Sequence, residues 1–317
     1  MNVIFLGTPE FAVGTLDAIC KSKHNVLAVV TAPDKPAGRG LKLKPSEVKE
    51  YAVDHGIPVL QPEKLKNEEF IEQLRSYNAD IFVVVAFRML PEVVYTMPKY
   101  GTFNVHASLL PNYRGAAPIQ WAVINGEEKT GVTTFFLDKQ IDTGDIIDAV
   151  EVEIGPRETT GELYDRLMHI GAELAVKTLD NVEAGTVVTR KQTDIPVENL
   201  KPAPKIFKED TFIDWEQPAQ VIFNKIRGLS PYPGACTFIT NKKGQDEFLK
   251  IYDAEIKPLT NKKQPGAIEI ELPNCFHIFT KDGIISVQNV QLQGKTRLKV
   301  SDFLRGFHPE NYSDTVH

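Results

Sequence analysis

The sequence of 317 residues contains only three cysteines, Cys20, Cys236 and Cys275, and they lie far apart without CxxC spacing. This pattern predicts neither a zinc site nor a disulfide framework, so we expect no metal and a reducing environment. No apolar run approaches the roughly 18–20 residues of a membrane span. The opening MNVIFLG lacks the basic segment and long apolar run of a signal peptide, and it predicts a strand instead. These absences favour a cytoplasmic protein without a membrane segment.

A dinucleotide fingerprint is also missing. Gly7-Thr8-Pro9 follows the first apolar run, where a G-x-G-x-x-G motif would bind a pyrophosphate, but the further glycines are absent. This argues against a nicotinamide or flavin cofactor.

The net charge of −6 argues weakly against nucleic-acid binding, but the charges are unevenly distributed. Residues 201–317 contain 16 Lys and Arg against 14 Asp and Glu, whereas residues 1–200 contain 20 against 28. The C-terminal part is therefore the more basic one, which permits RNA contact without demanding it.

Apolar runs and amphipathic segments alternate along the first 187 residues. Alternating strands and helices predict an α/β domain with a doubly wound, mostly parallel sheet. The expected strands are 3–6, 25–30, 81–86, 103–106, 133–137 and 146–150, and the expected helices are 11–20, 46–55, 70–77, 117–125 and 159–183.

The composition changes after residue 187. Pro196, Pro202 and Pro204 interrupt a polar stretch, which predicts an extended linker over residues 188–208. Residues 209–317 then predict one helix and several short, turn-separated strands, a pattern typical of a small β-barrel. We expect a catalytic domain over residues 1–187 and a second domain over residues 209–317.

The strongest functional signal lies at the end of one predicted strand. Asn104 and His106 are two positions apart, so their side chains point to the same side of that strand. The carboxyl ends of strands in open α/β sheets are where ligands bind. An amide donor beside an imidazole suits a reaction in which a carbonyl oxygen becomes negative.

A carboxylate could complete this pair. Asp142 lies in a loop dense in turn formers between two apolar runs, and the loop could return to His106. A carboxylate beside a histidine fixes its tautomer and favours its charged form. Asn104, His106 and Asp142 are therefore the candidate catalytic residues.

Long motifs make a family resemblance specific. The stretches NVHASLLPNYRGAAPIQWAVINGE and TGVTTFFLDKQIDTGDII resemble the catalytic core of folate-dependent formyltransferases. The stretches IFLGTPEFAV, APDKPAGRGLKLKPSEVK and PAPKIFKEDTFIDW resemble the members of that family that act on methionyl initiator tRNA. The resemblance covers essentially the whole chain, and it implies an OB-like fold for the second domain.

The resemblance also implies a set of binding residues. The formyl donor would be 10-formyltetrahydrofolate, and a loop over residues 33–45 would contact the acceptor end of the tRNA. The residues implied to bind the folate are Ser108, Leu109, Leu110, Pro111, Phe87, Arg88, Met89, Leu90, Asp138 and Ile141, and those implied to contact the tRNA are Arg39, Lys42 and Lys44.

These observations predict an enzyme that transfers a formyl group from the folate to methionyl initiator tRNA, with no obligatory protein partner. Two alternatives remain. A formyltransferase acting on a sugar nucleotide or a purine precursor would share the catalytic residues, but the basic loop argues against it. A folate- or RNA-binding protein without catalysis would not need Asn104, His106 and Asp142 together.

Overall fold

The computed structural model describes residues 1–37, 42–259, 261 and 263–317, and the chain divides into two compact units. The N-terminal unit comprises Met1–Pro118, Lys129–Glu153 and Tyr164–Ala203. The C-terminal unit comprises Ile119–Glu128, Ile154–Leu163 and Pro204–His317. The sequence gives no indication that the short segments Ile119–Glu128 and Ile154–Leu163 belong to the C-terminal unit. The domain boundaries at residues 187 and 208 remain a prediction.

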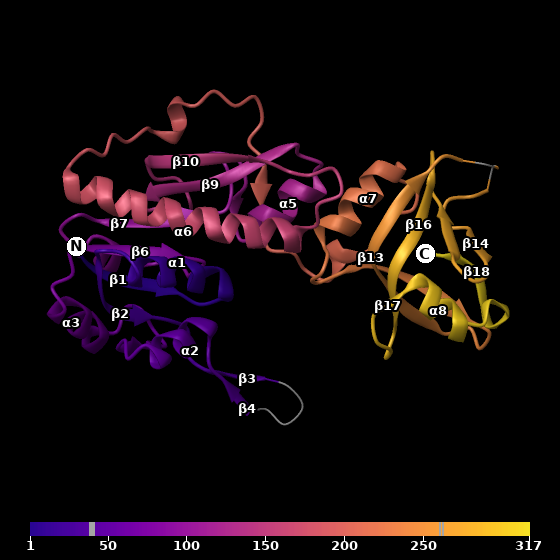
Figure 1. Cartoon of the computed structure of the whole chain (residues 1–317), viewed down its shortest axis with the longest axis horizontal. Helices are drawn as coiled ribbons and strands as arrows, with labels where there is room; N and C mark the ends of the chain where they lie inside the picture. The colour runs from indigo at the N-terminus through magenta and orange to yellow at the C-terminus, as the bar shows by residue number, and fades with distance from the viewer. Residues whose placement is uncertain (38–41, 260, 262) are drawn as a thin grey trace. The chain divides into compact units, whose positions relative to one another are not determined.

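The N-terminal unit is built on a mostly parallel sheet with the strand order β10-β9-β7-β6-β1-β2-β5 (Figure 1). β9 pairs antiparallel with β7, and β10 pairs antiparallel with β9. This is the doubly wound α/β architecture that the sequence predicts. The strands are β1 (Asn2–Gly7), β2 (Asn25–Val30), β5 (Val59–Leu60), β6 (Ile81–Val85), β7 (Thr102–His106), β9 (Lys129–Phe136) and β10 (Ile146–Glu153).

Helices cover both faces of this sheet because the central strands are apolar on both sides. On one face, Ile4 and Leu6 of β1 pack in a cluster with Phe70 and Leu74. On the other face, Gly171 of the long helix faces β7 and β9 side chains. The helices of this unit are α1 (Glu10–Cys20), α2 (Glu47–Asp54), α3 (Glu68–Ser76), α4 (Glu92–Tyr95) and most of α6 (Thr160–Ala184), whereas α5 (Pro118–Ile124) falls almost entirely in the C-terminal unit.

Local signals in the sequence explain several element ends. The Ser46 side chain accepts a hydrogen bond from the backbone N–H of Lys49, which caps the start of α2. Asn67 caps α3 in the same way. Gly126 follows α5 with a φ of 71°, a left-handed conformation that glycine adopts without strain.

Short pairings hold the connecting segments. β3 (Lys35–Ala37) and β4 (Lys42–Lys44) form an antiparallel pair. β8 (Arg114–Gly115) pairs in parallel with β11 (Pro202–Ala203). The stretch that the sequence predicts as an extended linker therefore contributes a strand to the N-terminal unit, and it also contains the 3-10 turn η1 (Gln192–Asp194).

The C-terminal unit is an antiparallel, nearly closed barrel with the strand order β14-β15-β16-β13-β12-β18, to which β17 adds beside β16 (Figure 1). An isolated bridge between Ala267 and Thr315 links the two ends of this order. The strands are β12 (Ala235–Asn241), β13 (Asp246–Lys257), β14 (Ile268–Glu271), β15 (Cys275–Phe279), β16 (Ile284–Leu292), β17 (Leu298–Lys299) and β18 (Tyr312–Val316).

Two helices complete this unit and share its apolar core. α7 (Ala219–Gly228) buries Ile222, Phe223 and Ile226, and α8 (Val300–Gly306) buries Phe303 and Leu304. The 3-10 turns η2 (Glu209–Thr211) and η3 (Pro309–Asn311) lie between elements. The sequence predicts the β-barrel and α7 but misses α8 and β18; the polar sequence YSDTV of β18 contains no apolar run. Within the described residues, no helix combines the length and apolar character needed to cross a membrane.

Candidate active site

The last residues of β7 carry the first two candidate catalytic side chains. Asn104 is half-buried and His106 is buried, with 6% of its surface exposed. Their register partners on β9 are Phe135 and Thr133. Both side chains therefore leave the same face of the sheet, as the alternation of a strand requires.

One ring nitrogen of His106 forms a hydrogen bond within the protein. Its Nε2 lies 2.8 Å from the carbonyl oxygen of Tyr113. A carbonyl can only accept a hydrogen bond, so Nε2 carries a proton. Nδ1 is therefore the nitrogen that can gain or lose a proton during a reaction.

The loop that carries Asp142 has to turn back to reach this histidine. β9 runs antiparallel to β7, so its end at Phe136 lies beside Phe103 rather than beside His106. Asp142 nevertheless places its Oδ2 3.9 Å from Nδ1 of His106. At this distance the two groups attract as an ion pair when the ring is charged, without a direct hydrogen bond.

The Asp142 carboxylate is held from a second side. Its Oδ2 accepts a hydrogen bond of 2.9 Å from the backbone N–H of Gly115. Asp142 itself has a φ of 56°, a left-handed conformation that aspartate tolerates better than most residues. Ala86 and Tyr113 also have positive φ. Such conformations cluster at functional sites, where the surrounding structure supports them.

Gln192 is a site residue that the sequence did not reveal. Its side-chain amide donates to the backbone carbonyls of Asp142 at 3.0 Å and Gly144 at 2.8 Å. Its Oε1 accepts from Nε and Nη2 of Arg114 at 3.0 and 2.6 Å. Gln192 falls in the polar stretch predicted as a linker, where nothing in the sequence distinguishes it. Tyr113, Arg114 and Gly115 stand in the family motif, but the motif alone gave them no role.

The loop after β7 contains four of the predicted folate residues. The Ser108 hydroxyl donates to the carbonyl of Asn112, and the Ser108 carbonyl accepts from the hydroxyl of Thr133. Ser108 is fully buried. Leu110 and Pro111 are buried too, and Leu109 is half-buried. Ser108 therefore stabilises this loop through internal hydrogen bonds.

The segment after β6 contains the next predicted folate residues. Arg88 donates to the backbone carbonyls of Glu63, at 2.8 Å, and of Pro62. Loss of hydration lowers the pKa of the Arg88 guanidinium, which stays charged at neutral pH because its ordinary pKa is above 12. Phe87 is half-buried under this guanidinium and Leu90 is buried, whereas Met89 is exposed.

The remaining folate candidates lie in the loop after β9. Asp138 accepts hydrogen bonds from the backbone N–H of Gln140 and from the Thr143 hydroxyl, which stabilises the loop. Ile141 is 62% exposed. Ile141 and Met89 are thus exposed apolar side chains, the kind of residue that packs against flat ligand rings such as a pterin.

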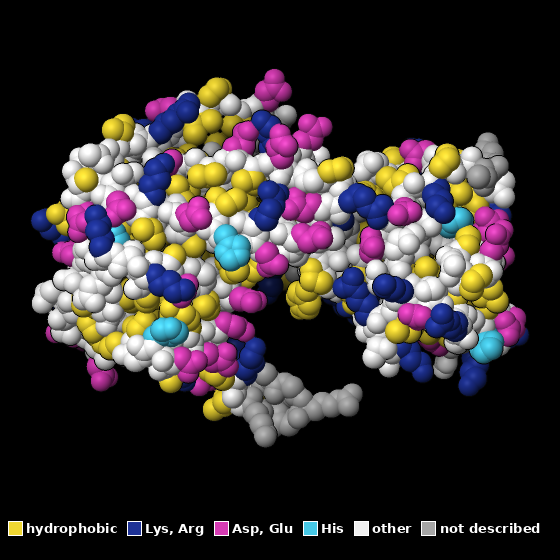
Figure 2. Space-filling model, in the orientation of Figure 1, with side chains coloured by type: hydrophobic (Ala, Val, Ile, Leu, Met, Phe, Trp, Pro, Cys, Tyr) yellow, Lys and Arg dark blue, Asp and Glu magenta, His cyan; other side chains and the backbone are white. Residues whose placement is uncertain are grey.

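The predicted tRNA residues are only partly visible. Arg39 and the side chain of Lys42 lie outside the described residues. The exposed Lys44 in β4 forms an ion pair of 3.0 Å with Glu47, and this hydrogen bond raises the pKa of the Lys44 ammonium. On the face shown in Figure 2, Lys and Arg side chains of the N-terminal unit are interspersed with Asp and Glu.

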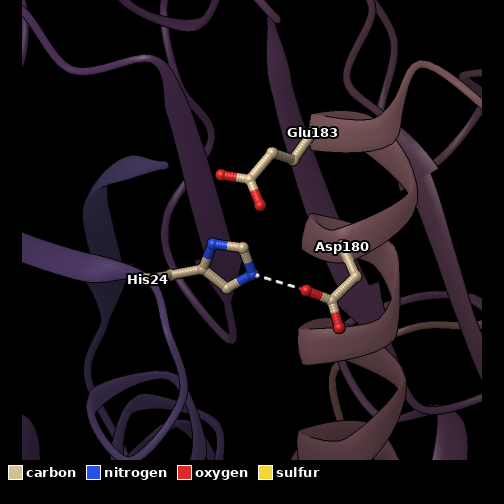
Figure 3. Close-up of side chains that lie close together, drawn as sticks. All are labelled: His24, Asp180 and Glu183. Carbon is tan, nitrogen blue, oxygen red and sulfur yellow. Dashed lines mark hydrogen bonds and ion pairs between the residues drawn. The ribbon is translucent and has the colours of Figure 1, made fainter.

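A separate cluster of possible metal ligands lies at the amino-terminal end of β2, whereas His106 lies at the carboxyl end of β7. His24 directly precedes β2, and its Nε2 lies 3.2 Å from Oδ1 of Asp180 in α6, with Glu183 one turn further along (Figure 3). Within the described part of the chain, this is the group whose His and carboxylate atoms lie close enough to share an ion. The Lys23 ammonium already pairs with Asp180 at 2.9 Å and Glu183 at 3.0 Å. The cluster is therefore a charge-compensated network.

Comparison with known protein families shows that this fold belongs to a class of group-transfer enzymes. Residues 1–179 match the formyl transferase family, and residues 205–308 match the formyl transferase C-terminal domain. The chain belongs to the formyltransferase family.

Two curated relatives show which members of the formyltransferase family the chain resembles. The chain is 50% identical over 309 residues to the methionyl-tRNA formyltransferase of Bacteroides fragilis, which covers 97% of this chain and 95% of that protein. It is 49% identical over 310 residues to the methionyl-tRNA formyltransferase of Parabacteroides distasonis, with 97% and 96% covered.

Solved structures share the fold at much lower identity. The sugar 3N-formyl transferase WlaRD has a TM-score of 0.62 at 22% identity, with 93% of this chain and 99% of that chain covered. HypX from Aquifex aeolicus in complex with tetrahydrofolic acid has a TM-score of 0.62 at 18% identity, with 95% and 46% covered. These likenesses confirm the formyltransferase fold that the sequence predicts.

Proposed function

We propose that this protein transfers the formyl group of 10-formyltetrahydrofolate to the amino group of methionyl initiator tRNA, giving formylmethionyl-tRNA for translation initiation. The observation that supports acyl transfer is the placement of His106 Nδ1 3.9 Å from the Asp142 carboxylate, beside Asn104 on the same strand face. The support for the acceptor is the likeness to methionyl-tRNA formyltransferases over 97% of the chain, including the C-terminal unit.

The chemistry begins when the amine nitrogen of methionine attacks the formyl carbon. The formyl oxygen becomes negative as the new C–N bond forms, and the Asn104 amide donates to it. Charged His106 stabilises the same oxygen, with Nδ1 as its exchanging nitrogen because Nε2 is committed to Tyr113. The Asp142 carboxylate compensates the charge on the ring.

Collapse of the intermediate breaks the bond between the formyl carbon and N10 of the folate. The amine nitrogen loses one proton and N10 gains one, so the reaction releases no net proton. Charged His106 has no free ring nitrogen, so Nδ1 first gives its proton to N10 as that bond breaks, and the neutral Nδ1 then accepts the proton that the amine nitrogen loses. Positioning and hydrogen-bond donors supply the catalysis in this scheme.

The binding roles follow the same division. The loop 108–111, the segment 87–90 and the loop containing Asp138 and Ile141 would bind the folate, with exposed backbone groups pairing to the pterin edge. Arg39, Lys42 and Lys44 would contact the acceptor end of the tRNA, where their charge attracts phosphates.

The test offers the purified protein 10-formyltetrahydrofolate and one of three acceptors: methionyl initiator tRNA, an amino-sugar nucleotide or an amino purine precursor. We expect formylmethionyl-tRNA from the first acceptor alone, and no product from the matched His106→Ala variant. Formylation of the sugar or purine precursor instead of the tRNA would overturn the proposed acceptor. Folate binding without any product would leave a binding protein.

A further inference from the structure

The side chain of Gln192 is a buried amide, and all of its hydrogen bonds go to residues of the candidate active site. Only 3% of its surface is exposed. Its two N–H groups reach the carbonyls of Asp142 and Gly144, and its oxygen receives two N–H groups from Arg114. A side-chain amide has two donors and two acceptor positions, so this environment satisfies it completely.

The partners also fix which way the amide points. Backbone carbonyls only accept hydrogen bonds, and a guanidinium only donates them. Only a group with donors on one side and an acceptor on the other can bridge Arg114 to these two carbonyls. A glutamate of the same shape would keep the contact to Arg114 and lose both donors to the loop.

The bridge holds the part of the loop that carries Asp142. Gln192 binds the carbonyls of Asp142 and Gly144, while Gly115 binds the Asp142 carboxylate. The preceding residue Ile141 is exposed. Without Gln192, Asp142 would still be held against β8 by the hydrogen bond from the Gly115 N–H to its carboxylate, but the loop backbone around it would lose its two bonds to the amide.

Three consecutive residues thus organise the site. The Tyr113 carbonyl accepts a hydrogen bond from His106, Arg114 donates to the Gln192 side chain that binds the Asp142 loop, and the Gly115 N–H donates to the Asp142 carboxylate. We infer that Gln192 is a positioning residue that sets the distance between Asp142 and His106 and so acts in formyl transfer through Asp142. The inference rests on the proposed function.

The first experiment compares Gln192→Glu and Gln192→Ala with the parent in formylation of methionyl-tRNA. We expect kcat to fall about 10- to 100-fold in both, because a displacement near 1 Å in a reacting group can cost that much. The KM for tRNA should stay within twofold. Thr193→Ala is the matched control, since Thr193 is the exposed neighbour in the same turn. Parent-like kcat in the folded Gln192→Glu protein would overturn the inference.

The second experiment separates positioning from a general loss of stability. We combine Gln192→Ala with Asp142→Asn and compare the double variant with both single ones. If Gln192 acts through Asp142, its substitution costs much less in the Asp142→Asn protein than in the parent. Equal, independent losses would show that Gln192 supports the fold without positioning Asp142.

The third measurement does not depend on activity. The ring ¹⁵N chemical shifts of His106 report its tautomer and its surroundings, so Gln192→Ala and Gln192→Glu should move them in the same direction as Asp142→Asn. Unchanged shifts in both folded variants would refute the inference even if no acceptor were formylated. An inactive parent whose His106 shifts respond as expected would instead count against the proposed function alone.

Discussion

Gly144→Ala tests how sharply the Asp142 loop has to be placed. Gly144 is buried where the loop returns towards β9, and its carbonyl is one of the two acceptors of Gln192. A Cβ added there would lie 1.7 Å from the backbone oxygen of Phe136, whereas real Cβ contacts essentially never fall below 3.0 Å. The obstacle is backbone, so it cannot rotate away as a side chain would.

The required movement follows from these distances. The loop or the end of β9 has to shift by about 1.3 Å, the difference between the required 3.0 Å and the available 1.7 Å. Asp142 lies two residues away and would move with the loop. A misplacement of about 1 Å can cost about 10²-fold in rate, so we expect kcat to fall by that order. Overpacking of this kind also costs about 1–3 kcal/mol of stability.

The assay is steady-state formylation of methionyl-tRNA at saturating folate, with thermal unfolding measured in parallel. Gly306→Ala is the control, because a Cβ at Gly306 would meet no atom within 4 Å and should leave kcat unchanged. A folded Gly144→Ala protein with kcat within twofold of the parent would refute the reasoning. The loop would then be free to move without consequence for the reaction.

Three further predictions concern separate parts of the molecule. Asn104→Ala removes an oxyanion donor and should lower kcat about 10²- to 10³-fold with little change in folate affinity; a loss of only a few-fold would contradict its role. Arg39→Ala and Lys44→Ala should weaken formylation of tRNA and flatten its salt dependence while folate binding is unchanged; curves identical to the parent would remove the tRNA role of the loop. Burial raises the pKa of Tyr164 to about 12 from the ordinary 10.0, so its contribution to stability is complete below pH 10 and is lost as pH rises through 12. Urea unfolding between pH 9 and 12 should therefore show a smaller alkaline loss of stability in Tyr164→Phe, and equal losses would exclude this origin.

The sequence by itself determined most of the elements of the N-terminal unit and predicts the chemistry of the candidate site. Continuous apolar runs and amphipathic segments of period 3.6 are local properties, so β2 and α6 could be predicted to within about a residue. Ser46 predicted the start of α2 because its side chain caps the helix from the position directly before its first residue. The placement of His106 at the end of β7 followed in the same way, because a strand fixes the side to which each residue points.

Tertiary structure decided how the site is held together. The loop after β9 starts beside Phe103, and only its folded path brings Asp142 to His106. Gln192 reaches the same loop across 50 residues of sequence through hydrogen bonds to backbone carbonyls. Every residue has such a carbonyl, so no side-chain pattern in the sequence marks which one will be bound. Composition therefore predicts a linker where the folded chain builds part of the candidate active site.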